Sequence, residues 1–576
     1  MVKMKGFSFR KTEYHEELCV KEGAITCKLC LKERVRIDRT RGGVHLNHCK
    51  RLLQSFLLLF FFSIVCSISS VSAETHPDYG KVFPPKETFR PGDWFVGAQP
   101  VQVDPTKSPI VFVQGKNGKA NDWYGDTYYH GKNNMYDSAY YAGYQTAFVQ
   151  LYDAAGTGSV SPWINGKLLA EKLELISQHF GKKVNIIAHS KGGIDTQAAL
   201  VQYGAHRFVD KVITLGSPHY GTHLADLSYS WWAGWLATLL GQQDEGTYAL
   251  QTGEMVRFRS IIDRNPAIKS NQYYTVAGKS WGPTFSALSV GGLYLSSYGN
   301  NDGLVSEWST TLPYGAHLFS DPTVDHDSIR TGTAVFSRIE PYLRTKNRGQ
   351  ELLLSSSSIH EPYIELGATE NRMVLGGELI PHQENRAVFS VDTLTPGTVS
   401  ILTASQSVAI QLISPSGEVY NKQEAVLTTG EDIFFKGAFV HTFQIKSMEI
   451  GEWKIGMNTE RRDAYLAIVQ YPQEAPFHLK IPAKVKGNQM EFQIHSSNEK
   501  ALEAEKIFMT VRVIDQTGIL ISQSDGVQQL DQNTLSTALK NIEKSGVYNL
   551  TIDVKGKNKE GRPYTRTIIR SMYIEK

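Results

Sequence analysis

Short apolar runs alternate with helical patterns over residues 74–349. IVFVQG (110–115), VNIIAHS (184–190) and KVITLGSP (211–218) have the length and composition of buried strands. Between the first two, GKLLAEKLELISQHF (166–180) repeats apolar residues at the spacing of one helix face. This alternation of strands and helices predicts a domain of the α/β class, with a mostly parallel sheet covered by helices on both faces.

The pattern changes after residue 350. LLLSSSS (352–358) is typical of a linker, and Thr/Val/Ile-rich segments then alternate with turn signals. A second break falls near YPQEAPF (471–477). We therefore predict a catalytic-type α/β domain at 74–349, an all-β sandwich at 350–473 and a second, Ig-like sandwich at 474–576.

The beginning of the chain has the features of a secretory signal peptide at 50–73. Two basic residues precede the uncharged stretch LLQSFLLLFFFSIVCSISSVSA, which ends in small residues, so we expect cleavage after Ala73 and a secreted protein. A membrane anchor is the alternative, but the apolar core at 57–68 is shorter than the ~20 residues of a spanning helix.

A polar prefix, residues 1–49, precedes this signal. Cys27-x2-Cys30 with His45, His48 and Cys49 has roughly the spacing of zinc ligands. The other interpretation is a start codon assigned too early, with translation beginning near Val44.

Composition narrows the function of the remaining chain. All five cysteines precede residue 74, so the rest can form no disulfide and has no thiol nucleophile. Residues 74–576 hold 47 Lys/Arg against 51 Asp/Glu, a balance that gives no support to a nucleic-acid partner.

AHSKG (188–192) is the strongest local motif. It follows an apolar run and precedes a helical pattern, the context of a nucleophile elbow, in which small residues permit a sharp turn. Ser190 is then the candidate nucleophile; the alternative is a serine that only caps a helix.

Two later motifs supply partners for Ser190. YGNNDGLVS (298–306) places Asp302 in a turn, and DHDSIR (325–330) places His326 further on. Their order, serine, acid, histidine, is that of α/β-hydrolase enzymes. His326 would act as the base and Asp302 would orient it.

Other aspartates compete for the role of the acid. Asp321, Asp325 and Asp327 lie close to His326 in sequence, but two of them adjoin it, where chain geometry disfavours contact with the ring. Asp195, on the helix after the elbow, is expected to make a local structural bond.

Acyl transfer also requires donors for the developing oxyanion. The backbone N–H of Lys191, after the nucleophile, is one candidate. The second is the backbone N–H of Lys116, in the loop after the first long strand.

These motifs together resemble the secreted bacterial lipases and esterases of the α/β-hydrolase fold. AHSKGG is similar to their AHSxGG elbow, and GSPHYGT (216–222), NNDGLVS and DHDSIR are similar to their later segments. The resemblance covers about residues 105–345. It implies hydrolysis of carboxylic esters with no cofactor for the chemistry.

The chain departs from this family at two points. Many members have His-Gly where this chain has Gln114-Gly115, which bears on the oxyanion loop. Some bind a structural calcium, for which Asp321 and Asp327 offer oxygen ligands. Zinc-binding insertions of some relatives are not clearly matched.

Substrate preference is indicated by aromatic residues. SYSWWAGWLATLLG (228–241) fits either a mobile cap at a lipid surface or a buried core helix. Residues 123–152 hold eight tyrosines and Trp123, which would line a pocket or pack the region.

We expect a lipase acting on triacylglycerol or a related lipid. The alternatives are a broad carboxylesterase or an extracellular polyester (polyhydroxyalkanoate) depolymerase. The β domains would bind an insoluble substrate or the cell envelope, or act as spacers. A different class, a non-catalytic binding protein on a hydrolase scaffold, is disfavoured by the complete Ser/Asp/His set.

Overall fold

The computed structural model describes residues 89–344 and 371–576, apart from gaps at 431–433, 473–476, 482–483, 487–488, 497–506, 527, 530–533, 540–541 and 559. The predicted signal peptide, the cysteine-containing prefix and the Ser-rich linker lie outside the described residues. Within them, no helix is long and apolar enough to span a membrane.

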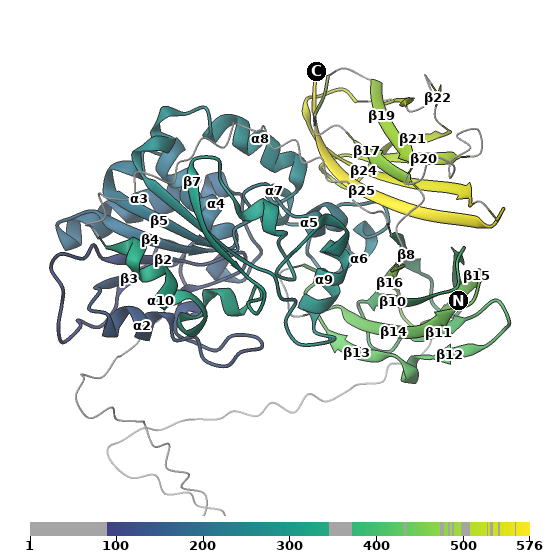
Figure 1. Cartoon of the computed structure of the whole chain (residues 1–576), viewed down its shortest axis with the longest axis horizontal. Coiled ribbons are helices and arrows are strands. Elements are labelled where there is room, and N and C mark those ends of the chain that lie inside the picture. The colour runs from purple at the N-terminus through teal and green to yellow at the C-terminus, as the bar shows by residue number, and fades with distance from the viewer. Residues whose placement is uncertain are drawn as a thin grey trace, which may run out of the picture. The chain divides into compact units, whose positions relative to one another are not determined.

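A seven-stranded sheet forms the centre of the first domain, as the apolar runs predict (Figure 1). Its order is β1-β3-β2-β4-β5-β6-β7, with β1 antiparallel to β3 and all other neighbours parallel. The strands are β1 (Trp94–Val96), β2 (Ile110–Val113), β3 (Thr146–Val149), β4 (Val184–His189), β5 (Val209–Leu215), β6 (Gln272–Gly278) and β7 (Gly315–Asp321).

Helices cover both faces of this sheet, because successive strand residues point to opposite sides. Ile110 and Phe112 of β2 join a core with α2 and α10, whereas Val111 and Val113 join another with α3, α4 and α8. The helices are α2 (Met135–Tyr141), α3 (Pro162–Phe180), α4 (Lys191–Gln197), α5 (His223–Ser228), α6 (Gly234–Leu239), α7 (Glu245–Ala249), α8 (Thr252–Ile262), α9 (Ala287–Leu295) and α10 (Gly332–Leu343).

The first β unit, β8 to β16, is a sandwich of two antiparallel sheets ordered β13-β14-β10-β16-β8 and β12-β11-β15-β9. This unit has a core of its own, in which Trp453 is fully buried. The strands are β8 (Arg372–Leu379), β9 (Asn385–Val391), β10 (Thr395–Thr403), β11 (Ala409–Ile413), β12 (Val419–Asn421), β13 (Val426–Thr429), β14 (Phe439–Met448), β15 (Gly451–Asn458) and β16 (Asp463–Gln470).

The second β unit, β17 to β25, has sheets ordered β17-β19-β23-β22 and β18-β25-β24-β20-β21 and a separate core. Two long strands, β24 and β25, dominate it. The strands are β17 (Phe477–Lys480), β18 (Lys484–Lys486), β19 (Gln489–Ser496), β20 (Phe508–Ile514), β21 (Leu520–Asp525), β22 (Gln528–Gln529), β23 (Thr534–Ala538), β24 (Gly546–Lys557) and β25 (Pro563–Glu575).

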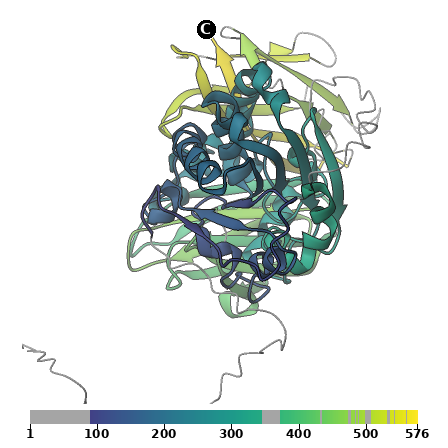
Figure 2. The ribbon, with the colours of Figure 1, turned by 90° about the vertical axis from the view of Figure 1, so that its left-hand side faces the viewer.

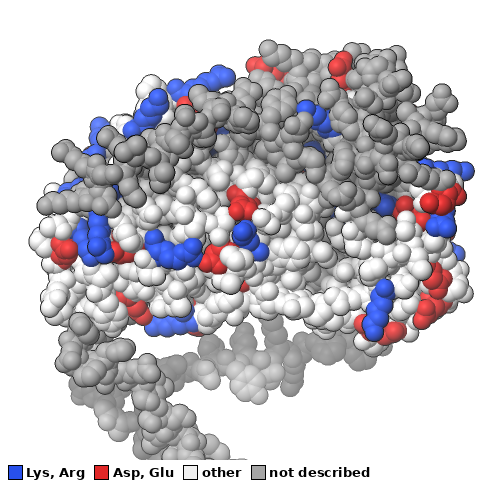
Figure 3. All heavy atoms as spheres, in the orientation of Figure 1, with Lys and Arg blue, Asp and Glu red and all other residues white. Residues whose placement is uncertain are grey.

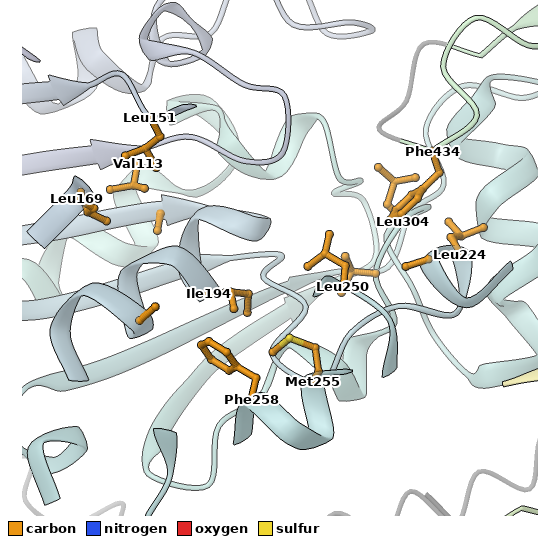
Figure 4. Packing of buried hydrophobic residues seen from close by; sticks show 14 of the residues in the cluster. Val113, Leu151, Leu169, Ile194, Leu224, Leu250, Met255, Phe258, Leu304 and Phe434 are labelled. Atoms are coloured by element: carbon orange, nitrogen blue, oxygen red, sulfur yellow. The ribbon is translucent and has the colours of Figure 1, made fainter. Parts of the chain in front are cut away.

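Both β units pack on the α/β domain. The cluster under α3, α4 and α8 continues into residues of the first β unit, among them Leu402 and Phe434, and reaches Ile569 of β25. Figure 4 shows Phe434 close to Leu224 of α5, and these two side chains line the same small cavity. Helix α8 lies against β25, where Gly253 N donates to Ser571 Oγ at 2.7 Å (Figure 2).

Charged side chains are mixed on the face drawn in Figure 3. Lysine and arginine are interspersed with aspartate and glutamate around broad uncharged areas. Because both signs alternate, the described residues of this face create no large field of one sign.

Candidate active site

Ser190 lies in the sharp turn between β4 and α4. Its φ of 53° and ψ of −133° fall outside the regions that a non-glycine residue ordinarily occupies. The turn requires glycine two residues after Ser190. A Cβ on Gly192 would overlap the carbonyl oxygen of Gln114. The AHSKG motif therefore forms a strained strand-to-helix turn, the geometry of a nucleophile elbow.

Asp302 and His326 form a buried pair. His326 Nδ1 lies 2.8 Å from Asp302 Oδ2. The other carboxylate oxygen accepts hydrogen bonds from the backbone N–H groups of Leu304 (3.1 Å) and Val305 (2.8 Å). Because the carboxylate is fixed by the backbone, it can hold the imidazole with Nε2 directed away from it.

This pair lies beside the nucleophile turn. Ser190 N donates to Leu215 O at 3.0 Å, and the next residue, Gly216, touches the pair. A Cβ on Gly216 would lie 2.9 Å from Asp302 Oδ2 and 3.3 Å from His326 Nδ1. The structure thus brings together three residues from the loops after β4, α9 and β7.

The site is closed in this form of the chain. Ser190 is 1% exposed and His326 is 4% exposed. Among the described residues, neither Ser190 Oγ nor His326 Nε2 has a hydrogen-bond partner. The two reactive atoms are therefore buried and are hydrogen-bonded neither to each other nor to another described group.

The competing aspartates have partners of their own. The pairs are Asp321–Arg338 at 2.5 Å, Asp325–His130 at 2.6 Å and Asp327–Arg330 at 2.6 Å. Asp302 is the carboxylate that faces the imidazole of His326. The two residues considered for calcium, Asp321 and Asp327, are each paired with arginine, and no group of three or more His, Cys, Asp or Glu among the described residues is placed to hold a metal.

The loop carrying Lys116 and the start of α4, which is Lys191, both lie at the nucleophile turn. A Cβ on Gly115 would lie 2.9 Å from Ser190 Cβ, so the loop carrying Lys116 runs against the turn. Lys191 is the first residue of α4, where backbone N–H groups lack acceptors within the helix.

The ammonium of Lys191 is buried between two carboxylates. It lies 3.0 Å from both oxygens of Asp195 and 3.3 Å from Asp153 Oδ2. Although burial opposes the charge, these carboxylates hold the pKa of Lys191 above its usual value. The expected local bond of Asp195 is confirmed by its contact with Lys191, four residues earlier on α4. Asn165 Nδ2 also donates to Asp195 Oδ2 at 2.9 Å.

Sequence reasoning missed His189, which precedes the nucleophile. Its Nε2 lies 2.9 Å from His326 O, and the two rings are 4.7 Å apart. Burial, followed by the charges of His326 and Arg330, lowers the pKa of His189 well below its usual value. A neutral ring with its proton on Nε2 donates to the carbonyl and so fixes the backbone of His326; no spacing signal points to this contact.

We name residues 229–243, which include α6, the tryptophan segment. It is partly a core helix, since Leu236 is fully buried, and partly a surface one, since Trp235 is 45% exposed. Trp231 N donates to Thr551 Oγ1 at 3.1 Å, and Trp232 Nε1 donates to Asp553 Oδ1 at 3.3 Å.

The first β unit contacts the same segment closely. A Cβ on Gly376 of β8 would overlap the carbonyl oxygen of Trp232. Arg512 of the second unit lies over the Trp232 ring, 5.3 Å from its centroid. The tryptophan segment is therefore held by both β units.

The tyrosine-rich stretch mostly packs the fold. Trp123, Tyr136, Tyr140 and Tyr144 are buried in the core with α2 and α10, whereas Tyr128 is 53% exposed. Of the two interpretations of this stretch, pocket lining or packing of the region, packing applies to these four residues.

The sheet order, the strained serine turn and the Asp302–His326 pair define an α/β-hydrolase of the serine type. No family model and no curated protein matches the chain. Among solved structures it is similar to Bacillus licheniformis lipase BlEst2 in propeptide form, with 32% identity, a TM-score of 0.68, and 84% of this chain and 98% of that chain covered. The mature form of BlEst2 matches at 44% identity and a TM-score of 0.41, over 44% of this chain and 99% of that chain.

The identity and coverage of the propeptide form show a common family. The chain belongs to the lipase and esterase family of α/β-hydrolases that includes BlEst2. The predicted fold class, an α/β-hydrolase followed by all-β sandwiches, is confirmed.

Proposed function

We propose that this chain is a secreted carboxylic ester hydrolase that works through Ser190, His326 and Asp302. His326 Nε2 takes the proton of Ser190 Oγ as the oxygen attacks the ester carbonyl. The C=O π electrons move to oxygen, and the backbone N–H groups of Lys116 and Lys191 stabilise that oxyanion. Asp302 stabilises the imidazolium formed in this step.

The tetrahedral intermediate then collapses. The C–O bond to the alcohol breaks, and His326 returns its proton to the leaving oxygen, which leaves an acyl group on Ser190. Water repeats the sequence with His326 as base, releasing the acid and restoring the serine. Every step uses side chains and backbone of this chain, so no cofactor is invoked.

The proposed substrate is a water-insoluble ester, with triacylglycerol or a related lipid ahead of a polyester. The exposed Trp235 and Leu239 on α6, 45% and 52% exposed, support an apolar substrate surface. The relative with which this chain shares 32% identity is named a lipase. A broad carboxylesterase is the alternative, since the same residues would cleave soluble esters.

The observation that carries this proposal is the pairing of buried Asp302 with His326 next to the strained Ser190 turn. The test uses residues 74–576 and Ser190→Ala, with Ser260→Ala on α8 as the matched serine control. Each is assayed on p-nitrophenyl esters of short to long chains, emulsified triglyceride and polyester granules.

We expect hydrolysis by the parent and the control, and a loss of at least about a thousandfold in Ser190→Ala. The chain-length profile then assigns the substrate. A folded parent that hydrolyses none of these esters would instead support the non-catalytic scaffold.

We further propose that the two β units act as a propeptide. The relative that matches 84% of this chain is named a propeptide form, and the present chain covers 98% of it. One observation supports a masking role: both β units contact the tryptophan segment. This role differs from the binding of substrate or cell envelope expected of the β domains from the sequence.

Limited proteolysis tests the propeptide. A protease is chosen to cut within 345–370, between α10 and β8, and the rate on p-nitrophenyl butyrate is followed with time. We expect the rate to rise as the cut chain accumulates, and Ser190→Ala to show the cut without the rise. An uncut chain that is as active as the cut one contradicts the masking role.

A further inference from the structure

Lys116 presents a buried charge in the oxyanion loop, residues 114–118. Its side chain is fully buried, and an ammonium out of water is costly unless a carboxylate and hydrogen bonds compensate it. Asp244 supplies that partner, with Oδ2 at 3.0 Å from Lys116 Nζ. Burial still lowers the pKa of Lys116, while Asp244 and, more weakly, Asp153 oppose the shift.

The carboxylate of Asp244 is fixed by four hydrogen bonds. Oδ2 accepts from Lys116 Nζ and from Ser159 N at 2.9 Å. Oδ1 accepts from Thr247 N at 2.7 Å and from Thr247 Oγ1 at 2.8 Å, which makes Asp244 the N-cap of α7. One side chain thus joins the start of α7 to the oxyanion loop.

Asp244 also lies at the base of the tryptophan segment. Tyr229 OH donates to Asp244 O at 3.0 Å, and Gln243 Nε2 donates to Ser228 O at 3.0 Å. These contacts bring the two ends of the segment together. Trp231 and Trp232 contact the β units, whereas Asp244, directly after the segment, holds Lys116.

The same carboxylate connects to the residue after the nucleophile. Ser159, whose backbone N–H donates to Asp244, donates its hydroxyl to Asp153 Oδ2 at 2.8 Å. Asp153 Oδ2 in turn lies 3.3 Å from Lys191 Nζ. The side chains of Lys116 and Lys191 are therefore both anchored by one buried polar network.

We propose that Asp244 is a positioning residue for ester hydrolysis: through its ion pair with Lys116 it sets the oxyanion loop and ties it to the base of the tryptophan segment. This inference rests on the proposed function. Asp244 touches neither Ser190 nor His326 in any described contact, and its effect passes through the backbone N–H of Lys116. Loss of the pair would leave a buried ammonium that draws the loop out of place.

The test compares Asp244→Asn with the parent chain, residues 74–576, before and after the cut within 345–370. Asparagine still caps α7 but offers no charge to Lys116. Lys116→Met and the double variant complete a cycle, because methionine removes the ammonium and keeps most of the length of the side chain. Ser286→Ala, which removes the N-cap of α9, is the matched control for a lost cap remote from the loop.

Rates on p-nitrophenyl butyrate are normalised to active sites titrated with a p-nitrophenyl phosphonate. We expect Asp244→Asn to lower kcat about ten- to a hundredfold, less than the loss of a whole oxyanion donor, with KM within twofold of the parent. The double variant should recover to the level of Lys116→Met, because it has no unpaired ammonium. Ser286→Ala should keep the parent kcat.

Several results overturn the proposal. One is a kcat for Asp244→Asn within twofold of the parent; another is a loss shared equally by Ser286→Ala; a third is a double variant worse than both single ones. If Asp244→Asn does not fold, the kcat of the double variant is compared with that of Lys116→Met instead. A double variant that is less active than Lys116→Met overturns the proposal. A parent without hydrolysis before and after the cut refutes the proposed function itself, which distinguishes the two failures.

Discussion

The two faces of the seven-stranded sheet are completed in different ways. Among the described residues, the buried members of the core with α2 and α10 all lie between Ile110 and Leu343, with Phe95 and Ala98 packed against them, so the α/β domain closes that face by itself. The opposite core runs from Val111 to Ile569 and takes in residues of both β units. Neighbouring residues of β2 therefore belong to different cores. Ile110 lies in the core that the α/β domain forms alone, and Val111 lies in the core shared with the β units. The face covered by α3, α4 and α8 depends on the β units for burial, whereas the face covered by α2 and α10 does not.

The largest effect should come from breaking the shared core at β10. Leu402 faces the shared core, while its neighbour Ile401 faces the first β unit's own core. Leu402→Asp should weaken the contact between the domains by at least about 3 kcal/mol, because it loses a buried leucine and buries an unpaired carboxylate.

Gel filtration after a cut within 345–370 measures this effect. The two parent fragments should elute together and the Leu402→Asp fragments apart, with the sandwich still folded. Val388→Asp, at a position 46% exposed on β9, should behave like the parent. Joint elution of the Leu402→Asp fragments would show that the shared core is not what joins them.

The second effect is a pH dependence of the contact between the α/β domain and the β units, and it should arise at His223 of α5. Its ring stacks on Tyr298 at 3.8 Å, and its Nδ1 lies 2.8 Å from Asp226. Burial, then the charge of Arg570 from β25, lowers the pKa of His223 to about 4, against the favourable pull of Asp226. Separation removes the charge of Arg570, so the separated state binds the proton more tightly.

The contact should therefore be strongest above the usual pKa of histidine, 6.5, and weaken as the pH falls toward 4, by up to about 3 kcal/mol. The measurement is the dissociation constant of the cut fragments from pH 7.5 to 4.5. In His223→Gln this dependence should be reduced. An affinity between the fragments that is constant over this pH range, or that rises in acid, would show that His223 does not control the strength of the contact.

The smallest effect should come from one hydrogen bond to the tryptophan segment. Thr551→Val keeps the shape of a fully buried side chain but removes the acceptor for Trp231 N. Such a loss costs about 1 kcal/mol, or roughly a fivefold weaker contact between the fragments. Titration of the fragments by fluorescence of the tryptophans would measure it. A change beyond tenfold would mean that the segment is held mainly at this point.

The sequence was sufficient to predict those parts of the site that are formed by short, continuous segments. The AHSKG turn was predictable because its small residues and flanking elements leave few other conformations for Ser190. The order of Asp302 and His326 identified the two side chains that the structure pairs. The α/β sheet followed from the lengths of the apolar runs.

Contacts between distant segments were not predictable. Asp244 is far from Lys116 in sequence, and its N-cap role gives no sign of a second partner. The apolar character of α6 left open whether solvent, lipid or protein covers it, because burial alone does not name the covering surface. For the same reason the β units looked independent, although Leu402 and Phe434 complete the core of another domain.

The absence of cysteine after residue 66 has a consequence for the fate of a cut chain. No disulfide can join the α/β domain to the β units. While the backbone is intact, each part meets the other at an effective concentration in about the millimolar range. Once the backbone is cut, that advantage disappears, and the fraction of the α/β domain that keeps the β units bound is set by how far the two pieces are diluted.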